Sequence, residues 1–267
     1  MGGDARFVSL RALLEKDGHQ VFPVAMEKAL PLQGPPDYIG TEAVILPLPA
    51  EKGGALHSPL GHGKYMLAEL LEPLRPGTKV FGGMIGEPLR ELCRERGLVL
   101  YDYFQREDFQ IKNALLTAEG AATLLLGLDG RGLMGRRALI VGFGRIGKLL
   151  APRLQAFGMH VSVMARSASQ RAWAEAMGCT ALKMGENHGE TDFLLNTVPA
   201  LVFGEAELRR LGDSVLIELA SAPGGFDEKA ASALGKTIVK APGLPARWAE
   251  ISAAEAIRDT IYNIVSE

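Results

Sequence analysis

The stretch Ala138–Leu150, ALIVGFGRIGKLL, decides the fold of this chain. Its first four residues form a short apolar run with the length of a buried parallel strand. Gly142, Gly144 and Gly147 follow in the G-x-G-x-x-G spacing, and the residues after them have the pattern of an amphipathic helix. A strand, a glycine turn and a helix in this order, with a second strand beyond, predict a dinucleotide-binding turn. A tight turn with a purely structural role is the alternative.

Each glycine of the turn has an expected task. Gly142 would permit the tight turn, Gly144 would let the backbone approach a pyrophosphate, and Gly147 would let the helix pack close to the strand. The phosphates would lie on N–H groups at the positive end of the helix. The residues predicted to bind the cofactor here are Gly142, Phe143, Gly144, Arg145, Ile146 and Gly147.

The second strand of this half, within His160–Ser167, indicates which dinucleotide is bound. NAD sites usually carry Asp or Glu at the end of this strand, but here Ala165, Arg166 and Ser167 stand there. A guanidinium and a hydroxyl suit a 2′-phosphate, which a carboxylate would repel. We therefore expect NADP as the cofactor; the alternative is an Arg166 that points into solvent.

Composition excludes several classes of function. The chain has 267 residues, 47% of them hydrophobic, and a net charge of −2. This gives no electrostatic argument for nucleic acid or an anionic membrane surface, and no apolar run is long enough to span a bilayer. No secretory signal is recognisable, and Cys93 and Cys179 are isolated. We expect a cytoplasmic protein without a metal site.

Strands and helices alternate along both halves, which predicts an α/β fold with two doubly wound parallel-sheet domains. The predicted division is a substrate-side domain (1–113), a connecting helix (114–130), a Rossmann domain (131–247) and a C-terminal helix packing back on the junction (248–267). The first half contains predicted strands at Val21–Val24, Ala43–Pro49, Lys79–Gly83 and Val99–Phe104. Further cofactor-binding residues are expected where later strands end: Thr197, Val198, Pro199, Ala220 and Pro242.

Two polar groups could belong to the substrate site. The long loop Glu51–Gly63 carries His57 and His62, which could meet an anionic substrate or simply be solvated. The apolar segment Phe109–Leu128 contains Lys112, Asn113, Thr117 and Glu119. We expect Glu119 to be buried there, where a carboxylate needs a partner or a function. These four residues are either a helix-capping cluster, with Thr117 as cap, or polar groups that face a cleft between the domains.

Several segments together make the chain similar to one family, the A subunits of dipicolinate synthase. They are GGDAR (2–6), FQIKNALLTAEGA (109–121), VGFGRIGK (141–148), ARS (165–167), NTVPALV (196–202), ELASAPGG (218–225) and KAPGLP (240–245). The resemblance implies a flavodoxin-like N-terminal domain, an NADP-binding Rossmann domain and an architecture like that of D-2-hydroxyacid and alanine dehydrogenases. In this family GGDAR follows a first strand, so a truncated or mis-assigned start is expected.

The resemblance also implies a reaction and partners. The family oxidises a dihydro or hydroxytetrahydro form of dipicolinate from a branch of the lysine pathway during sporulation, in the mother-cell cytosol. The expected partners are a flavoprotein-like second subunit (the B subunit), a small dicarboxylate substrate and further copies in an oligomer.

Roles for individual residues follow from this expected reaction. We expect Glu119 and His62 to handle the proton, with Asn113 and Thr117 as orienting groups. Substrate carboxylates would be bound by Arg6, Gly83, Lys112 and Gly243. The alternatives are an NADP-dependent 2-hydroxy or 2-oxo acid reductase and a non-catalytic NADP-binding subunit. No histidine follows His188, which weighs against hydroxyacid chemistry that uses a late histidine.

Overall fold

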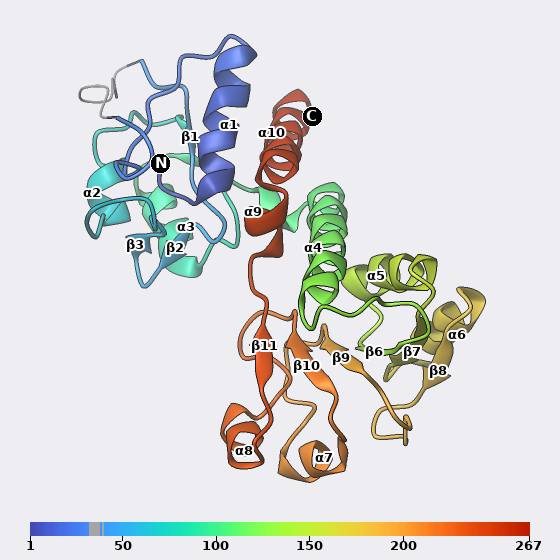
Figure 1. The fold of residues 1–267 in the computed structure, drawn as a ribbon. Helices are drawn as coiled ribbons and strands as arrows, with labels where there is room; N and C mark the ends of the chain where they lie inside the picture. The colour runs from blue at the N-terminus through green and yellow to red at the C-terminus, as the bar shows by residue number, and fades with distance from the viewer. Residues whose placement is uncertain (32–37, 39) are drawn as a thin grey trace. The chain divides into compact units, whose positions relative to one another are not determined.

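The protein is described by a computed structural model that covers residues 1–31, 38 and 40–267 and divides into two compact units. Unit 1 comprises Met1–Asn113 and Ala249–Glu267, and unit 2 comprises Ala114–Trp248 (Figure 1). Each contains a parallel sheet with helices packed on it, so the predicted α/β class with two parallel-sheet domains is confirmed.

Among its described residues, unit 1 has a sheet of three parallel strands in the order β1-β4-β5. Its strands are β1 (Ala43–Ile45), β4 (Lys79–Gly82) and β5 (Val99–Asp102), and β2 (Glu51–Lys52) pairs with β3 (Ala55–Leu56) in a separate hairpin. Its helices are α1 (Ala5–Lys16), α2 (Leu67–Leu71), α3 (Glu87–Glu95), the 3-10 turn η1 (Tyr103–Gln105) and α10 (Glu250–Ser266).

Two hydrophobic clusters cover the two faces of this sheet. Val44 and Val80 pack in one cluster with α2 and α3. Phe81 packs in the other with α1 and α10, which lie side by side (Figure 1). Asp4 caps α1 by accepting a hydrogen bond from the Arg6 N–H.

Two expectations for unit 1 were wrong. Val21–Val24 is an irregular segment rather than a strand, and Pro23 has no N–H to give to a sheet. The expected loop Glu51–Gly63 contains the β2–β3 hairpin, because Gly53 and Gly54 both adopt positive φ and supply the two-residue turn that hairpins favour.

Unit 2 has a sheet of six parallel strands in the order β11-β10-β9-β6-β7-β8. The strands are β6 (Arg137–Val141), β7 (His160–Met164), β8 (Thr180–Leu182), β9 (Phe193–Asn196), β10 (Val215–Glu218) and β11 (Ile238–Lys240). The helices are α4 (Glu107–Gly127), which carries the chain into this unit, α5 (Arg145–Ala156), α6 (Ala168–Ala176), α7 (Glu205–Arg210), α8 (Glu228–Ala233) and α9 (Leu244–Trp248).

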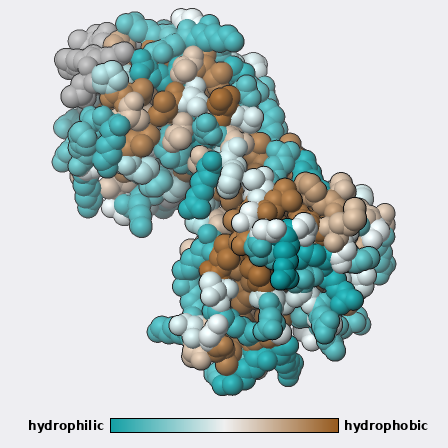
Figure 2. Space-filling view, viewed as in Figure 1, coloured by the Kyte–Doolittle hydropathy of each residue, from teal (hydrophilic) through white to brown (hydrophobic). Residues whose placement is uncertain are grey.

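Alternate residues of each strand of unit 2 face opposite sides of the sheet. Ile140 and Leu195 pack with α4 and α5, whereas Leu139, Leu194 and Leu216 pack with α7 and α8. Both faces are therefore covered, which explains why these strands are continuous apolar runs. Figure 2 shows one surface view, in which hydrophobic residues gather in the middle of unit 2 among more hydrophilic ones.

Candidate dinucleotide site

The glycine turn lies between β6 and α5, at the point where the strand order of the sheet changes direction. β6 pairs with β7 on one side and with β9 on the other. Gly142 follows the last residue of β6, and Gly144 is the N-cap of α5. Parallel sheets bind ligands at such a switch point, beyond the carboxyl ends of the strands.

Close packing requires glycine at two positions of the turn, and the third glycine leaves open space. Gly142 has φ +87°, and a Cβ there would lie 2.6 Å from Thr197 Oγ1. A Cβ at Gly147 would lie 2.5 Å from the carbonyl oxygen of Gly142, so the first turn of α5 packs against the strand end. A Cβ at Gly144 would meet nothing within 4 Å, and no side chain caps α5 at this residue. Open space over a helix start suits a phosphate group.

Thr197 connects the end of β9 with this turn. Its hydroxyl donates to the carbonyl oxygen of Val141 at 2.8 Å, and its backbone N–H donates to the same oxygen at 2.9 Å. A Cβ at Gly142 would also meet the Val198 side chain at 2.7 Å. The structure therefore brings Gly142, Thr197 and Val198 together.

The segment after β7 presents polar groups at the edge of the same site. Ala165 is buried, whereas Arg166 and Ser167 are exposed, and Ser167 is the N-cap of α6. Arg171 donates to the carbonyl oxygens of Ala165 and Arg166 at 2.9 and 2.7 Å, which fixes the turn that carries Arg166.

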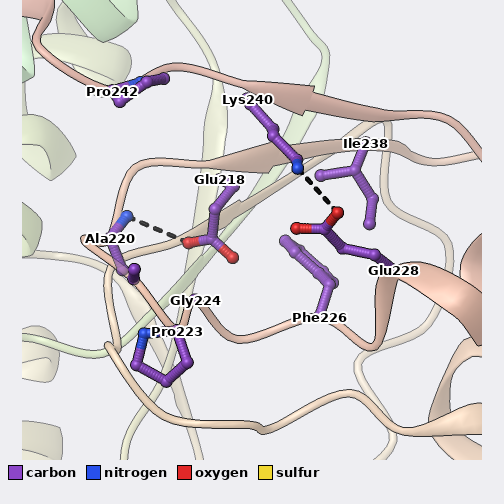
Figure 3. Close-up of a pocket in the computed structure, with 10 residues that line it drawn as sticks. Glu218, Ala220, Pro223, Gly224, Phe226, Glu228, Ile238, Lys240 and Pro242 are labelled. Carbon is purple, nitrogen blue, oxygen red and sulfur yellow. Dashed lines mark hydrogen bonds and ion pairs between the residues drawn. The ribbon is translucent and has the colours of Figure 1, made fainter.

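The loops after β10 and β11 line a common pocket (Figure 3). Ala220 and Pro242, both predicted to bind the cofactor, contribute to it, while Pro199 lies exposed after β9. Lys240 and Glu228, which also line it, form an exposed ion pair at 2.7 Å.

The residues present fit a dinucleotide. The close approach at Gly147, the open space over Gly144 and the absence of a side-chain cap leave backbone at the helix start for a pyrophosphate. Within the described residues, no group of three or more His, Cys, Asp or Glu is arranged to hold a metal ion. The same part of the chain includes no helix long and apolar enough to cross a membrane.

In unit 1, Arg6 and Gly83 both lie beside Leu48, near the carboxyl ends of the strands. The buried Arg6 guanidinium donates to Asp4 through Nε (2.9 Å) and Nη2 (2.8 Å), and Nη2 also donates to the Leu48 carbonyl oxygen at 2.8 Å. The N–H of Gly83 donates to Pro47 at 3.1 Å. That N–H is therefore already paired, and the binding of a substrate carboxylate by backbone N–H groups near Gly83 stays a prediction.

The two histidines of the segment 51–63 differ in environment. His62 is exposed, and its backbone N–H donates to Glu27 at 3.2 Å. His57 is half-buried, and its Nδ1 atom is buried without a hydrogen-bond partner among the described residues. Burial lowers the pKa of His57, and the nearby charge of Asp4 opposes this effect.

The polar residues of α4 are divided between the units. Asn113 ends the first segment of unit 1, where Lys112 pairs with Asp259 of α10 at 3.3 Å. Thr117 is buried in the middle of the helix, so its predicted role as a helix cap was wrong. α4 begins ten residues earlier, at Glu107.

Glu119 was expected to be buried, and the structure corrects this. Its side chain is 50% exposed and pairs with Arg153 of α5, with 3.3 Å between Oε1 and Nη2. Gly243, expected to bind a carboxylate, has φ +66° and lies exposed in the turn before α9. Roles in catalysis or substrate binding for both residues stay predictions.

Three residues of the site were missed by sequence reasoning. Arg171 holds the turn after β7, and Asn196 and Glu218 are joined at the ends of β9 and β10. The pair Gly224-Gly225, close after Glu218, is the signal in the sequence that something approaches this loop closely.

In comparisons with known proteins, each half of the chain matches a family model. The family model for the N-terminal domain of the dipicolinate synthase A subunit matches residues 1–104. The family model for the NAD-binding domain of D-isomer-specific 2-hydroxyacid dehydrogenases matches residues 100–223. Fold, turn and these matches define the class: an oxidoreductase with a dehydrogenase-type domain for a nicotinamide dinucleotide.

Matches that cover most or all of the chain point to one kind of oxidoreductase within this class. The A subunit of dipicolinate synthase from Bacillus subtilis is 27% identical over 85% of this chain and 78% of its own length. A crystal structure of the Bacillus subtilis A subunit matches with a TM-score of 0.84 and 25% identity, covering 99% of this chain and 94% of that one. The structure of the Bacillus halodurans A subunit shares the fold at a TM-score of 0.88, with 24% identity, over 100% and 96% of the two chains. The chain is similar to the dipicolinate synthase A subunits along nearly its whole length, so the resemblance seen in its motifs is confirmed.

Proposed function

We propose that this chain is the oxidoreductase subunit of a dipicolinate synthase that uses NADP to oxidise dihydrodipicolinate, or its hydroxytetrahydro precursor, to pyridine-2,6-dicarboxylate. The observation that carries the proposal is the open helix start at Gly144 in a chain whose first 104 residues match the A-subunit family. We place this activity in the mother-cell cytosol during sporulation, in an oligomeric enzyme whose second component is a flavoprotein-like B subunit.

The reaction balances with one dinucleotide for each ring. Bound NADP⁺ would accept a hydride from a ring carbon. The dihydro ring loses one further proton as the pyridine forms, and the hydroxytetrahydro precursor loses one water in addition. Formation of an aromatic ring favours this direction, so the chain mainly has to hold the ring and accept a proton.

The chain's own residues support NADP at the β7 end of the site. Arg166 is exposed, and Arg171 holds its carbonyl oxygen, so the Arg166 side chain leaves a fixed turn. The guanidinium can form a bidentate pair with a 2′-phosphate, and Ser167 adds a hydroxyl beside it.

The substrate-side assignments remain our proposal. Glu119 and His62 are the proposed proton-handling groups, with Asn113 and Thr117 as orienting groups. The proposed carboxylate-binding residues are Arg6, Gly83, Lys112 and Gly243. The existing pairs of Lys112 with Asp259, Arg6 with Asp4 and Glu119 with Arg153 would have to be shared or exchanged when substrate binds.

The test is turnover with defined components. The purified chain, with and without the B subunit, is given the cyclised intermediate of the lysine pathway together with NADP⁺ or, in a separate assay, with NAD⁺. We expect NADPH and dipicolinate, each measured by its ultraviolet absorbance, to be formed in equal amounts. No product with either dinucleotide would overturn the proposed reaction.

The match of residues 100–223 to 2-hydroxyacid dehydrogenases favours a second candidate, an NADP-dependent 2-hydroxy or 2-oxo acid reductase. Turnover of simple hydroxy acids, with none of the cyclic substrate, would select this candidate. Tight dinucleotide binding without any turnover would select a non-catalytic binding protein instead.

A further inference from the structure

A buried amide and a carboxylate are joined at the carboxyl ends of β9 and β10. Asn196 is the last residue of β9 and is 0% exposed. In the sheet register it stands beside Val141 of β6 on one side and Glu218 of β10 on the other. Asn196 Nδ2 donates to Glu218 Oε1 at 2.7 Å. Val141 immediately precedes the glycine turn, and Asn196 immediately precedes Thr197. The Asn196–Glu218 link therefore lies at the base of the loops that follow these strands.

The Glu218 carboxylate ties down the loop that follows β10. Oε1 also accepts from the Ala220 N–H at 3.0 Å, and Oε2 accepts from the Gly225 N–H at 2.7 Å. Figure 3 shows the Glu218 side chain turned toward Ala220, with Pro223 and Gly224 on the same loop. Three donors therefore converge on one carboxylate, and such charge-assisted bonds are about twice as strong as neutral ones.

The Asn196 side chain forms hydrogen bonds that hold the loop after β9. Its Oδ1 accepts from the Val198 N–H at 3.1 Å, and its Nδ2 donates to the Val198 carbonyl oxygen at 2.9 Å. Both atoms of the amide are therefore used, and the orientation of the amide is set by its partners.

The glycines of the β10 loop are explained by this pair. A Cβ at Gly224 would lie 2.9 Å from Glu218 Oε2, and a Cβ at Gly225 would lie 2.4 Å from Asn196 Nδ2. The Gly225 carbonyl oxygen in turn accepts from the N–H groups of Val202 and Phe203 at 2.9 and 2.8 Å. Glycine at these two positions therefore allows the backbone of the loop to pack directly against Asn196 and Glu218.

We propose that Asn196 and Glu218 are positioning residues for the nicotinamide half of the dinucleotide site. They set the loops Thr197–Pro199 and Ala220–Gly225, whereas the turn at Gly142–Gly147 and the segment Ala165–Ser167 receive the pyrophosphate and the adenosine half. The inference rests on the proposed function, because it assumes that a dinucleotide lies across these strand ends. It goes further in assigning two buried residues to one half of that ligand.

The test compares Glu218→Gln with Asn196→Asp and with the double variant. In Glu218→Gln one accepting oxygen becomes an NH₂ group that opposes a backbone N–H, while size and shape are kept. In Asn196→Asp two carboxylates are brought together. In the double variant the amide and the carboxylate have exchanged strands, so the link between β9 and β10 is restored in part. Glu205→Gln, in an exposed ion pair with Arg209 on α7, is the matched control.

Binding of NADPH and NADH is measured alongside binding of 2′,5′-ADP and AMP, which represent the adenosine half. We expect each single variant to bind the preferred dinucleotide at least tenfold more weakly, with the half-cofactor within twofold of wild type. The double variant should regain part of the loss, and Glu205→Gln should bind like wild type. The unchanged half-cofactor affinity shows that the variants are folded.

Two results overturn the inference. The single variants could bind the full dinucleotide as well as wild type does, or they could lose both ligands equally, which would show a general structural role. A wild-type chain that binds neither NADPH nor NADH would instead remove the proposed function on which the inference rests.

Discussion

Replacing Gly144 by alanine separates the ligand-binding role of the glycine turn from its structural role. Gly144 has φ −81° and ψ −158°, an extended conformation that alanine adopts without strain. The added methyl group would meet no atom within 4 Å, whereas one at Gly147 would lie 2.5 Å from the Gly142 carbonyl oxygen. Gly144→Ala therefore fills only the space in which we expect a pyrophosphate.

The effect on stability should be close to zero. Alanine is a poorer N-cap than glycine, which costs roughly 0.5 kcal/mol. Alanine also restricts the unfolded chain, which stabilises the folded state by about 0.4–1 kcal/mol. These terms oppose each other, so we expect a net change within about 0.5 kcal/mol and a shift in Tm below about 2 °C.

The effect on binding should be much larger. A methyl group at Gly144 would push a phosphate away from the helix start and remove at least one charge-assisted hydrogen bond. Such a bond contributes about 1.5–3 kcal/mol, which corresponds to a dinucleotide affinity about 10- to 150-fold lower.

Fluorescence titration with NADPH and NADH measures this difference, and thermal unfolding checks the stability. Gly132→Ala is the matched control, because Gly132 is also exposed, lacks a positive φ and has no atom within 4 Å of the position that a methyl group would take. Equal affinity of Gly144→Ala and wild type would refute the reasoning, because it would show that no phosphate approaches the backbone there.

Three further predictions follow from the same structure. Arg166→Asp should change the preference from NADP to NAD, because a carboxylate repels the 2′-phosphate; an unchanged ratio of the two affinities would remove the role given to Arg166 and Ser167. Glu119→Ala should lower turnover while cofactor affinity and Tm stay nearly constant, because its ion pair with Arg153 is exposed and contributes little to stability; full activity would leave Glu119 with only that surface pair. Burial raises the pKa of the Cys93 thiol to about 11 and also raises that of Cys179. Neither thiol should therefore react with Ellman's reagent at pH 8 until the protein is unfolded in guanidinium, and rapid labelling of the native protein would contradict this.

The parts of the site that the sequence predicts are those built from neighbouring residues. The strand, the three glycines and the helix start lie within one stretch of the chain, and the spacing of the glycines alone predicts the turn. Short-range patterns of this kind need no knowledge of the sheet.

The link between Asn196 and Glu218 could not be predicted in this way. It depends on the register between β9 and β10, which sets two residues 22 positions apart side by side. The mistake over Glu119 has a related cause. The side of α4 that carries this residue could not be assigned from an apolar segment whose helix begins earlier than expected, at Glu107.

The β2–β3 hairpin shows a different kind of miss. Its signal, Gly53-Gly54, was present in the sequence, but the strands on either side have only two residues each. Such short strands carry no readable alternation, so the segment had the appearance of a loop.

The most direct test of the account is amide hydrogen exchange of the purified chain with and without NADPH or NADH. The central claim is that a dinucleotide lies across the turn at residues 142–147. The account predicts slower exchange in that turn and in Ala165–Ser167, and stronger protection by NADPH than by NADH. Unchanged exchange at residues 142–147 with both dinucleotides at saturating concentration would contradict it.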